Sequence, residues 1–317
     1  MDAKKQTGSN QMKKTILVTG GAGFIGSHLV DALVKDGHNV HVMDDLSTGQ
    51  HNNLNSKATF HNFDIATDLA KINTFFRDFR PNYVFHLAAM ARIQDTVDKP
   101  LRGWEVNATA TLRLLQNCRE WGAKFVFSSS SSVYGEVPVG LSIPEDYRVA
   151  PISLYGLQKL AAEQMTLLYS KFYGVETIAL RYFNVYGSAR QNPEGAYPTV
   201  FSAFGKYGKN GNITIYGDGS KARDYVHVHD VVNANKMWID MDKGWNDVYN
   251  VGIGTPYSVN DVAEFFKPVE ITYDPDRPGD PQWSCADSSK LQALGWSPEM
   301  GFEEGVRFYL ADIAYGK

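Results

Sequence analysis

An apolar segment, a run of glycines and a helical pattern follow one another near the start of the chain, and together they constrain its fold most. Thr15–Thr19 has the pattern of a short buried strand, and residues 27–34 repeat their apolar positions at helical spacing. The glycines between them fit both G-x-G-x-x-G (Gly21, Gly23, Gly26) and G-x-x-G-x-x-G (Gly20, Gly23, Gly26). Glycines allow a tight turn and bring the backbone close to a pyrophosphate, which then meets the free N–H groups of the helix N-terminus. A glycine pattern alone is weak, but between a strand and a helix it predicts a dinucleotide-binding unit.

Strand and helix patterns alternate through the first half of the chain. Strands are expected at residues 39–43, 60–65, 83–89, 125–127 and 177–181, and helices at residues 100–121 and 155–173. This alternation is typical of an α/β fold with a doubly wound parallel (Rossmann) sheet. After residue 182 the alternation lapses, which predicts a smaller C-terminal α/β substrate lobe. We therefore expect a disordered tail at residues 1–12, a dinucleotide-binding Rossmann domain at residues 13–182, and a smaller lobe at residues 183–317 with segments that pack back on the first domain.

Composition excludes several classes of protein. The 317 residues are 43% hydrophobic, which is enough to build a core for two joined lobes. A formal net charge of −4 without a basic field argues against nucleic acid as a partner. No stretch is long enough to span a bilayer, and the polar N-terminus lacks the apolar segment of a secretory signal, so we expect a cytoplasmic protein with no membrane partner. Cys118 and Cys285 are too few for a disulfide framework, and no zinc-like spacing occurs, so no metal is expected.

Acidic residues at two strand ends indicate how a cofactor would be held. Asp44 ends the second strand pattern, where a carboxylate accepts hydrogen bonds from ribose hydroxyls and repels a 2′-phosphate, so NAD is favoured over NADP. Asp64, near the end of the third pattern, could accept a hydrogen bond from the adenine amine, and a solvated loop acid is an equally good interpretation. His86, in the next strand pattern, is interpreted as a core histidine rather than a catalyst.

A serine run and a Tyr-x-x-x-Lys sequence point to catalysis. Residues 128–132 are all serine and follow a buried strand, so their hydroxyls lie at the carboxyl edge of the sheet, where ligands bind in such folds. Tyr155 and Lys159 are four residues apart and share one face of a helix. A phenol has a pKa of about 10, and a nearby cation favours the phenolate and moves this pKa toward the working range. Taken alone, Tyr-x-x-x-Lys is equally an ordinary helix surface.

Charged and aromatic residues of the second half have a pattern of nucleotide recognition. Arg223 and Arg277 could clamp a second diphosphate as bidentate donors, and Tyr216 could stack on a base. Each arginine could equally be a solvated surface charge.

Seven motifs occur in order between about residue 14 and the C-terminus. They are Thr-Gly-Gly-Ala-Gly-Phe-Ile-Gly, His-Leu-Ala-Ala, Ser-Ser-Ser-x-x-Val-Tyr-Gly, Tyr-x-x-x-Lys, Arg-Tyr-Phe-Asn, Arg-Asp-Tyr-Val-His-Val and Arg-Pro-Gly-Asp. In these motifs the chain resembles the extended short-chain dehydrogenase/reductase family, and within it nucleotide-sugar epimerases of the UDP-galactose 4-epimerase type. The resemblance implies bound NAD and C4 epimerisation of a UDP-sugar by transient oxidation to a 4-keto sugar, rotation and re-reduction. It makes residues 13–182 the NAD-binding Rossmann domain and residues 183–317 the nucleotide-sugar-binding lobe. It also implies a homodimer that pairs through two helices of each subunit.

The resemblance also implies roles for individual residues. Tyr155 would be the base, Lys159 its electrostatic partner and ribose ligand, and Ser130 the catalytic hydroxyl. The residues implied for the cofactor are Gly20, Gly23, Phe24, Ile25, Gly26, Asp44, Asp64, Ile65, Leu87, Ala88, Ala89, Asn107, Tyr155, Lys159 and Tyr182. The residues implied for the substrate are Arg92, Ser130, Asn184, Tyr216, Arg223, Arg277, Asp280 and Ser284.

The identity of the sugar depends on a few positions. Related dehydratases carry Asp-Glu, and decarboxylases Glu, after the catalytic hydroxyl, whereas this chain has Ser131 and Ser132 and lacks the acid that elimination needs. In the family, the position matched by Ser284 lies beside the sugar's 2-substituent, and a serine leaves room for an N-acetyl group. We therefore expect UDP-N-acetylglucosamine and UDP-N-acetylgalactosamine as substrates, alongside UDP-glucose and UDP-galactose. Arg92 would instead favour a 6-carboxylate, which makes UDP-glucuronate the alternative.

Two departures from the family pattern and two rival functions remain. Gln158 stands where a small residue is usual before the lysine, and residues 90–92 differ from the usual string. A reductase or dehydrogenase of the same fold, acting on a nucleotide sugar, is one rival. The other is a catalytically silent NAD-binding regulatory protein, which would usually have lost Tyr155 or Lys159.

Overall fold

The structure is a computed structural model that describes residues 12–191, 199–207, 211–239, 241–266, 269–276 and 280–315. The tail expected at residues 1–12 lies outside these ranges apart from Met12, and Arg277 also lies outside them. Within the described ranges, no helix is both long enough and apolar enough to cross a membrane.

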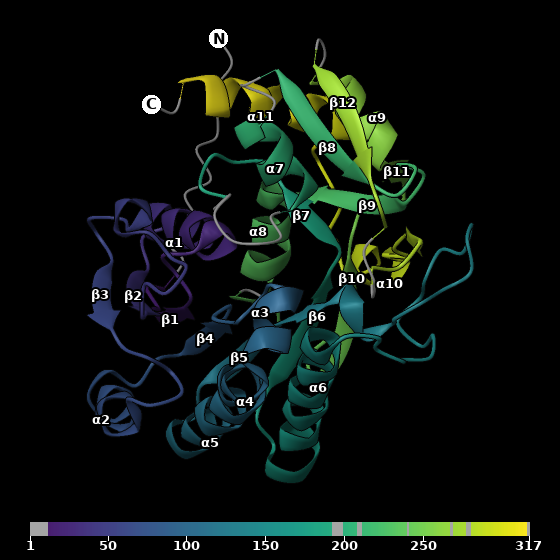
Figure 1. Ribbon diagram of the computed structural model, residues 1–317. Helices are drawn as coiled ribbons and strands as arrows, with labels where there is room; N and C mark the ends of the chain where they lie inside the picture. Colours follow the sequence, from purple (N-terminus) through teal and green to yellow (C-terminus); the bar gives the residue numbers. More distant parts are fainter. Residues whose placement is uncertain are drawn as a thin grey trace, which may run out of the picture.

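A seven-stranded parallel sheet forms the centre of the protein (Figure 1). Its strand order is β10-β6-β5-β4-β1-β2-β3, so the direction in which the strands are added reverses beside β1, where such folds bind ligands. The strands are β1 (Thr15–Thr19), β2 (Asn39–Asp44), β3 (Thr59–Asn62), β4 (Tyr83–His86), β5 (Lys124–Ser130), β6 (Thr177–Tyr182) and β10 (Asp247–Val251). The central strands are buried along almost their whole length, as their continuous apolar runs predict.

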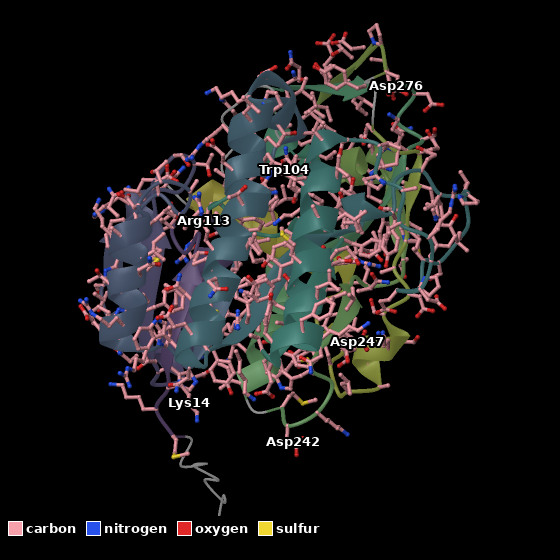
Figure 2. The ribbon with its side chains drawn as sticks, turned by 90° about the horizontal axis from the view of Figure 1, so that it is seen from below. Lys14, Trp104, Arg113, Asp242, Asp247 and Asp276 are labelled. Carbon is pink, nitrogen blue, oxygen red and sulfur yellow. The ribbon has the colours of Figure 1, made fainter. Side chains whose placement is uncertain are left out.

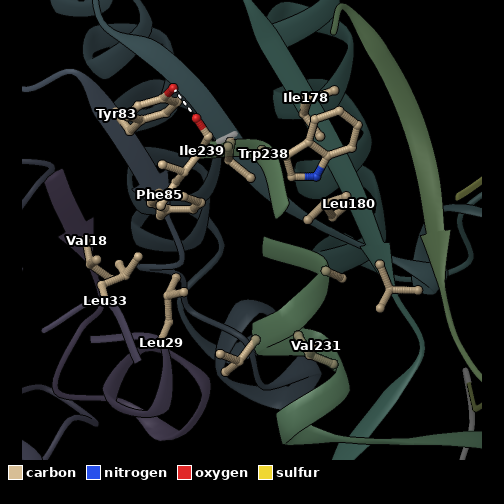
Figure 3. Packing of buried hydrophobic residues seen from close by; sticks show 14 of the residues in the cluster. Val18, Leu29, Leu33, Tyr83, Phe85, Ile178, Leu180, Val231, Trp238 and Ile239 are labelled. Carbon is tan, nitrogen blue, oxygen red and sulfur yellow. Dashed lines mark hydrogen bonds between the residues drawn. The ribbon is translucent and has the colours of Figure 1, made fainter. Parts of the chain in front are cut away.

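Helices cover both faces of this sheet. On one face, α1 (Phe24–Lys35) and α8 (Val228–Lys236) contribute Leu29, Leu33 and Val231 to a core that includes Trp238 (Figure 3). On the other face lie α2 (Leu69–Phe79), α5 (Ala110–Trp121) and α6 (Leu154–Tyr173). Figure 2 shows two long helices of this second face running side by side. Helices on both faces confirm the predicted doubly wound Rossmann fold.

The second lobe lies above the large sheet in Figure 1 and has its own aromatic core. In a four-stranded sheet, β9 pairs with β7, β11 and β13, and β8 pairs with β12 in a separate ribbon. Its strands are β7 (Asn184–Tyr186), β8 (Asn212–Tyr216), β9 (Ala222–His227), β11 (Pro256–Ser258), β12 (Glu270–Asp274) and β13 (Trp283–Ser284). Its helices are α7 (Val200–Tyr207), α9 (Val259–Glu264), α10 (Ser289–Gln292) and α11 (Phe302–Tyr315).

Several elements differ in extent from the prediction. The helix expected at residues 100–121 consists of α4 (Pro100–Trp104), a π-helical turn (Glu105–Thr109) and α5, preceded by the short α3 (Ile93–Asp98). Single 3-10 turns occur at His51–Asn53, Ser131–Val133 and Met237–Ile239. The strands expected at residues 60–65 and 83–89 end earlier, at Asn62 and His86, while β5 continues through the first three serines. The seventh strand, β10, comes from the region assigned to the second lobe, and α8 of that region packs against α1, as expected of segments that return to the first domain.

Candidate active site

A cavity of about 780 Å³ opens along the carboxyl edge of the large sheet. Side chains from the loops after β1, β2, β4 and β5, from α6 and from the start of the second lobe line it. The predicted residues that line it are Gly20, Gly23, Phe24, Ile25, Gly26, Asp44, Asp64, Ile65, Leu87, Ala88, Ala89, Arg92, Ser130, Tyr155, Lys159 and Tyr182. Its volume is typical of sites for cofactors and other small molecules.

The turn between β1 and α1 needs its glycines. The Gly20 amide donates to the Met43 carbonyl at 2.8 Å, and the Gly23 amide donates to the Gly20 carbonyl at 3.1 Å. Gly20 has a φ of +71°, and a Cβ on it would lie 2.6 Å from the Ala88 nitrogen. A Cβ on Gly26 would lie 2.1 Å from the Gly20 oxygen. The backbone therefore closes tightly beneath the first turn of α1, where free N–H groups can meet a phosphate.

Asp44 lies at the end of β2 and is 7% exposed. Its two carboxylate oxygens accept hydrogen bonds from the Ala22 amide at 3.0 Å and the Leu46 amide at 2.9 Å, which fixes the side chain at the edge of the cavity. Burial raises its pKa, while these two backbone hydrogen bonds oppose the rise. An anchored carboxylate at this strand end is suited to ribose hydroxyls and unsuited to a 2′-phosphate.

Asp64 lies in the loop after β3 rather than in the strand. Its carboxylate accepts a hydrogen bond from Arg102 at 2.7 Å, a contact that the sequence analysis did not predict. Burial alone would raise its pKa, but hydrogen bonds from the Ala66 amide, from Thr67 and from Arg102 lower it overall. Arg102 is in α4, and an arginine near the start of a helix gave no pattern that would have identified this contact.

Tyr155, Ser130 and Lys159 are brought together at the cavity wall. Burial raises the pKa of the Tyr155 phenol to about 12, and the nearby Ser130 hydroxyl opposes this rise. Lys159 is 3% exposed, donates to the Ser128 carbonyl at 2.7 Å, and has its pKa lowered by burial to about 7. Ser153 begins α6 as its N-cap, accepting a hydrogen bond from the Gly156 amide at 3.1 Å, and so fixes the helix end that carries Tyr155. The three groups form a proton-transfer site with the phenol still protonated.

The serines around Ser130 have separate structural partners. Ser128 shares a hydrogen bond with the Tyr182 hydroxyl at 3.0 Å, and Ser129 donates to Glu163 at 2.6 Å. Ser130 lies within hydrogen-bonding distance of Ser132 at 3.1 Å. The first two hydroxyls are therefore engaged within the fold, while Ser130 is the serine whose hydroxyl opposes the rise in the pKa of Tyr155.

His86 is a core residue, as the sequence indicated. Its two ring nitrogens lie 2.7 Å from Thr19 Oγ1 and 2.9 Å from Thr111 Oγ1, and it is 1% exposed. Burial lowers its pKa to about 3, so it stays neutral and takes no part in proton exchange near neutral pH.

Four of the predicted substrate residues form a second group in the other lobe and do not line the cavity described above. Asn184 Nδ2 lies 3.3 Å from Ser284 Oγ, and Ser284 pairs with Arg223 across β13 and β9. Arg223 donates to Asp280 at 2.7 Å and to the Pro281 carbonyl, so its guanidinium is held within the lobe. Tyr216, at the end of β8, is 38% exposed and also lies apart from the cavity lining.

Asn107 lies behind the cavity wall instead of in it. It is 1% exposed, and its carboxamide bonds to the backbone of Met90 and to the side chain of Gln158. A contact between its side chain and a cofactor, as predicted, would need those bonds to break. Other lining residues were missed by the sequence analysis, namely Phe183, Val185, Arg190, Gln191 and Thr199 from the segment after β6.

Comparison with known proteins agrees with this site. A sequence profile of the NAD dependent epimerase/dehydratase family matches residues 16–252. The UDP-glucose 4-epimerase of Thermotoga maritima, solved with UDP-glucose, is 40% identical, with a TM-score of 0.91 over 95% of this chain and 99% of that one. The Thermus thermophilus UDP-glucose 4-epimerase, solved with NAD, is 36% identical, with a TM-score of 0.90 over 96% and 100%. The UDP-N-acetylglucosamine 4-epimerase of Methanobrevibacter ruminantium, solved with UDP-N-acetylmuramic acid, is 37% identical, with a TM-score of 0.88 over 96% and 99%.

The residues present fit the cofactor that the family uses. The glycine at position 26 lets the start of α1 pack directly on the Gly20 backbone, which a Cβ would prevent, and Asp44 is anchored where the ribose of a dinucleotide would lie. The resemblance to the UDP-galactose 4-epimerase type is thereby confirmed, as is NAD as cofactor. The profile covers more than half of the chain and the relatives match almost all of it, so this chain belongs to the NAD dependent epimerase/dehydratase family.

Proposed function

We propose that the protein epimerises UDP-N-acetylglucosamine and UDP-N-acetylgalactosamine at C4, with UDP-glucose and UDP-galactose as further substrates. The observation that carries the C4 chemistry is the grouping of Tyr155, Ser130 and Lys159 on the wall of the cavity that contains the glycine turn. The two residues after Ser130 are serines, so the positions that carry the acid in related dehydratases hold no carboxyl group.

Each of the three side chains has a task in moving the proton of the sugar hydroxyl. Tyr155 takes the proton, and Ser130 shares the hydrogen bond that holds the oxygen in place. Burial keeps the phenol protonated, so its ionisation depends on positive charge close by, and Lys159 lies one helical turn along α6. Bound NAD supplies the hydride chemistry.

Ser284 supports the choice of an N-acetylated sugar. It is 7% exposed and contacts Asn184, in the strand that directly follows the cavity residues Tyr182 and Phe183. A tyrosine ring there would overfill the space, and overpacking of a close-packed site is costly. The small hydroxyl leaves this space to the substrate.

Arg92 supports UDP-glucuronate as the second candidate. Arg92 lines the same cavity as Tyr155 and lies in the loop between β4 and α3. A guanidinium in that position is suited to pair with a 6-carboxylate.

The test is a panel of UDP-sugars with chromatographic separation of the products. Wild type is expected to interconvert the two N-acetylhexosamine nucleotides. Ser284→Tyr should lose that activity and keep activity on UDP-glucose, while the control Ser284→Ala should keep both. Equal losses on both sugar classes in Ser284→Tyr would refute the pocket assignment. Preference for UDP-glucuronate, abolished by Arg92→Gln, would establish the second candidate instead.

We also propose a cytoplasmic homodimer that pairs through α6 and the segment of α3 and α4. Large apolar side chains are exposed there, with Leu101 at 81%, Phe172 at 67% and Trp104 at 44%. Figure 2 views this face, with Trp104 labelled. Such a patch is typical of an interface between subunits. Leu101→Glu is expected to halve the mass measured by sedimentation, whereas Phe308→Glu on α11 should leave it unchanged; a monomeric wild type would exclude the dimer.

Both cysteines are unpaired thiols, as a reducing compartment such as the cytoplasm would leave them.

A further inference from the structure

Gln158 lies between the two proposed catalytic residues of α6, yet it does not line the cavity. It is 3% exposed, and its Oε1 accepts a hydrogen bond from Asn107 Nδ2 at 2.7 Å. Tyr155 and Lys159, three residues before it and one after it, both line the cavity. A buried carboxamide at this place connects the back of the catalytic helix to another element.

That element is the loop between β4 and α3. The side chain of Asn107 forms hydrogen bonds with the backbone of this loop at Met90. Asn107 Oδ1 accepts from the Met90 amide at 2.8 Å, and its Nδ2 donates to the Met90 carbonyl at 3.1 Å. The Nδ2 group has two hydrogens, and the second is the one that Gln158 accepts. Gln158 therefore adds a third hydrogen bond to the two that hold the Asn107 carboxamide against Met90.

Met90 begins a stretch, residues 90–92, that lines the cavity up to Arg92 at the start of α3. Asn107 itself is in the π-helical turn Glu105–Thr109, a departure from α-helical geometry that often occurs at functional sites. Catalytic helix, π-helical turn and cavity loop are thus joined by one chain of buried hydrogen bonds.

Gly103 provides the space that Gln158 occupies. A Cβ on Gly103 would lie 2.9 Å from Gln158 Nε2 and 3.1 Å from its Oε1. Gly103 is buried in the short helix α4, where alanine would be the better helix former. The glycine and the long side chain are complementary in shape.

We propose that Gln158 is a positioning residue that acts through Asn107: it holds the loop Met90–Arg92 at a fixed distance from Tyr155, and so determines how the sugar is held for proton transfer. The inference rests on the proposed function, because a sugar must occupy the space between this loop and Tyr155. The nucleotide is expected to be bound elsewhere, by the second lobe, so its affinity should not depend on Gln158.

The first experiment removes the acceptor while keeping the side-chain length. In Gln158→Met, kcat/KM for the preferred UDP-sugar should fall about three- to tenfold, the value of one lost hydrogen bond. In calorimetry, the affinity for UDP-sugar should fall by a similar factor and the affinity for UDP alone should stay within about twofold. Wild-type kcat/KM in this variant, or an equal weakening of both ligands, would overturn the proposal.

The second experiment displaces Gln158 from the opposite side. Gly103→Ala should reproduce the defect of Gln158→Met, because the new methyl group pushes the carboxamide away from Asn107. The same Gly103→Ala change made in Gln158→Ala should add no further loss, since the space is then free; an additive loss would refute the coupling. If wild type epimerises no UDP-sugar at all, the proposed function fails, while the comparison of UDP-sugar with UDP binding still tests the role of Gln158.

Discussion

A buried ion pair contacts Ser129 of β5, and its removal has a predictable cost in stability. Arg181 is 4% exposed and Glu163 is 0% exposed. The guanidinium donates to the carboxylate twice, at 2.6 Å and 2.9 Å, and Ser129 donates to the same carboxylate at 2.6 Å. Arg181 also donates to the Tyr134 hydroxyl at 2.8 Å.

Loss of either partner leaves the other charge buried and unpaired. Glu163→Leu and Arg181→Met should therefore each lower the free energy of unfolding by about 3–5 kcal/mol. The double variant removes both charges and leaves chiefly the Ser129 hydroxyl without its acceptor, at a cost of about 1–3 kcal/mol. The double variant should thus be more stable than either single variant.

The measurement is urea unfolding of the four proteins at one saturating NAD concentration, because a bound ligand adds to the apparent stability. The double-mutant cycle should give a coupling of about 3 kcal/mol or more in favour of the pair. If the two single effects add to within about 0.5 kcal/mol, the residues do not interact and the reasoning is refuted.

Three further outcomes are expected. Gly26→Ala places a Cβ 2.1 Å from a backbone oxygen, so the NAD content of the purified protein, measured by chromatography, should fall by a factor of about ten or more. The control Gly301→Ala, whose Cβ has no neighbour within 4 Å, should keep the normal NAD content. Tyr155→Phe should lower kcat roughly 10²-fold or more with UDP affinity unchanged in calorimetry, and near-normal turnover would contradict its role as base. His86 has a pKa of about 3 in the folded protein and about 6.5 in the unfolded chain, so its contribution to stability is complete above pH 6.5 and is lost as the pH falls toward 3. His86→Asn should therefore flatten the fall of the unfolding free energy below pH 6.5. An unchanged slope would contradict the assignment.

Local pattern was sufficient for the parts of the site that a single segment encodes. The glycine turn, Asp44 at the end of β2 and the Tyr155–Lys159 pair each depend on spacing within a few residues, and all of them line the cavity. The family motifs supplied Ser130, which lines the same cavity as Tyr155 from a different segment.

Contacts between distant segments were beyond the sequence. The partner of Asp64 is Arg102, 38 residues away. Asn107 was predicted as a cofactor ligand because the sequence does not reveal that its carboxamide forms hydrogen bonds with Met90 and Gln158. The strand β10 was missed for a related reason: its five residues follow a stretch without regular alternation, and only pairing with β6 defines them as part of the large sheet.

The place of β10 has a consequence for how the protein is made. This strand pairs with β6 through residues 247–251, so the large sheet cannot be completed until most of the second lobe has been synthesised. A ribosome adds about 5–20 residues each second, and during that interval β6 has an unpaired edge that other chains can join. A fragment ending at residue 182 would leave that edge without its partner strand, and we expect such a fragment to be prone to aggregation.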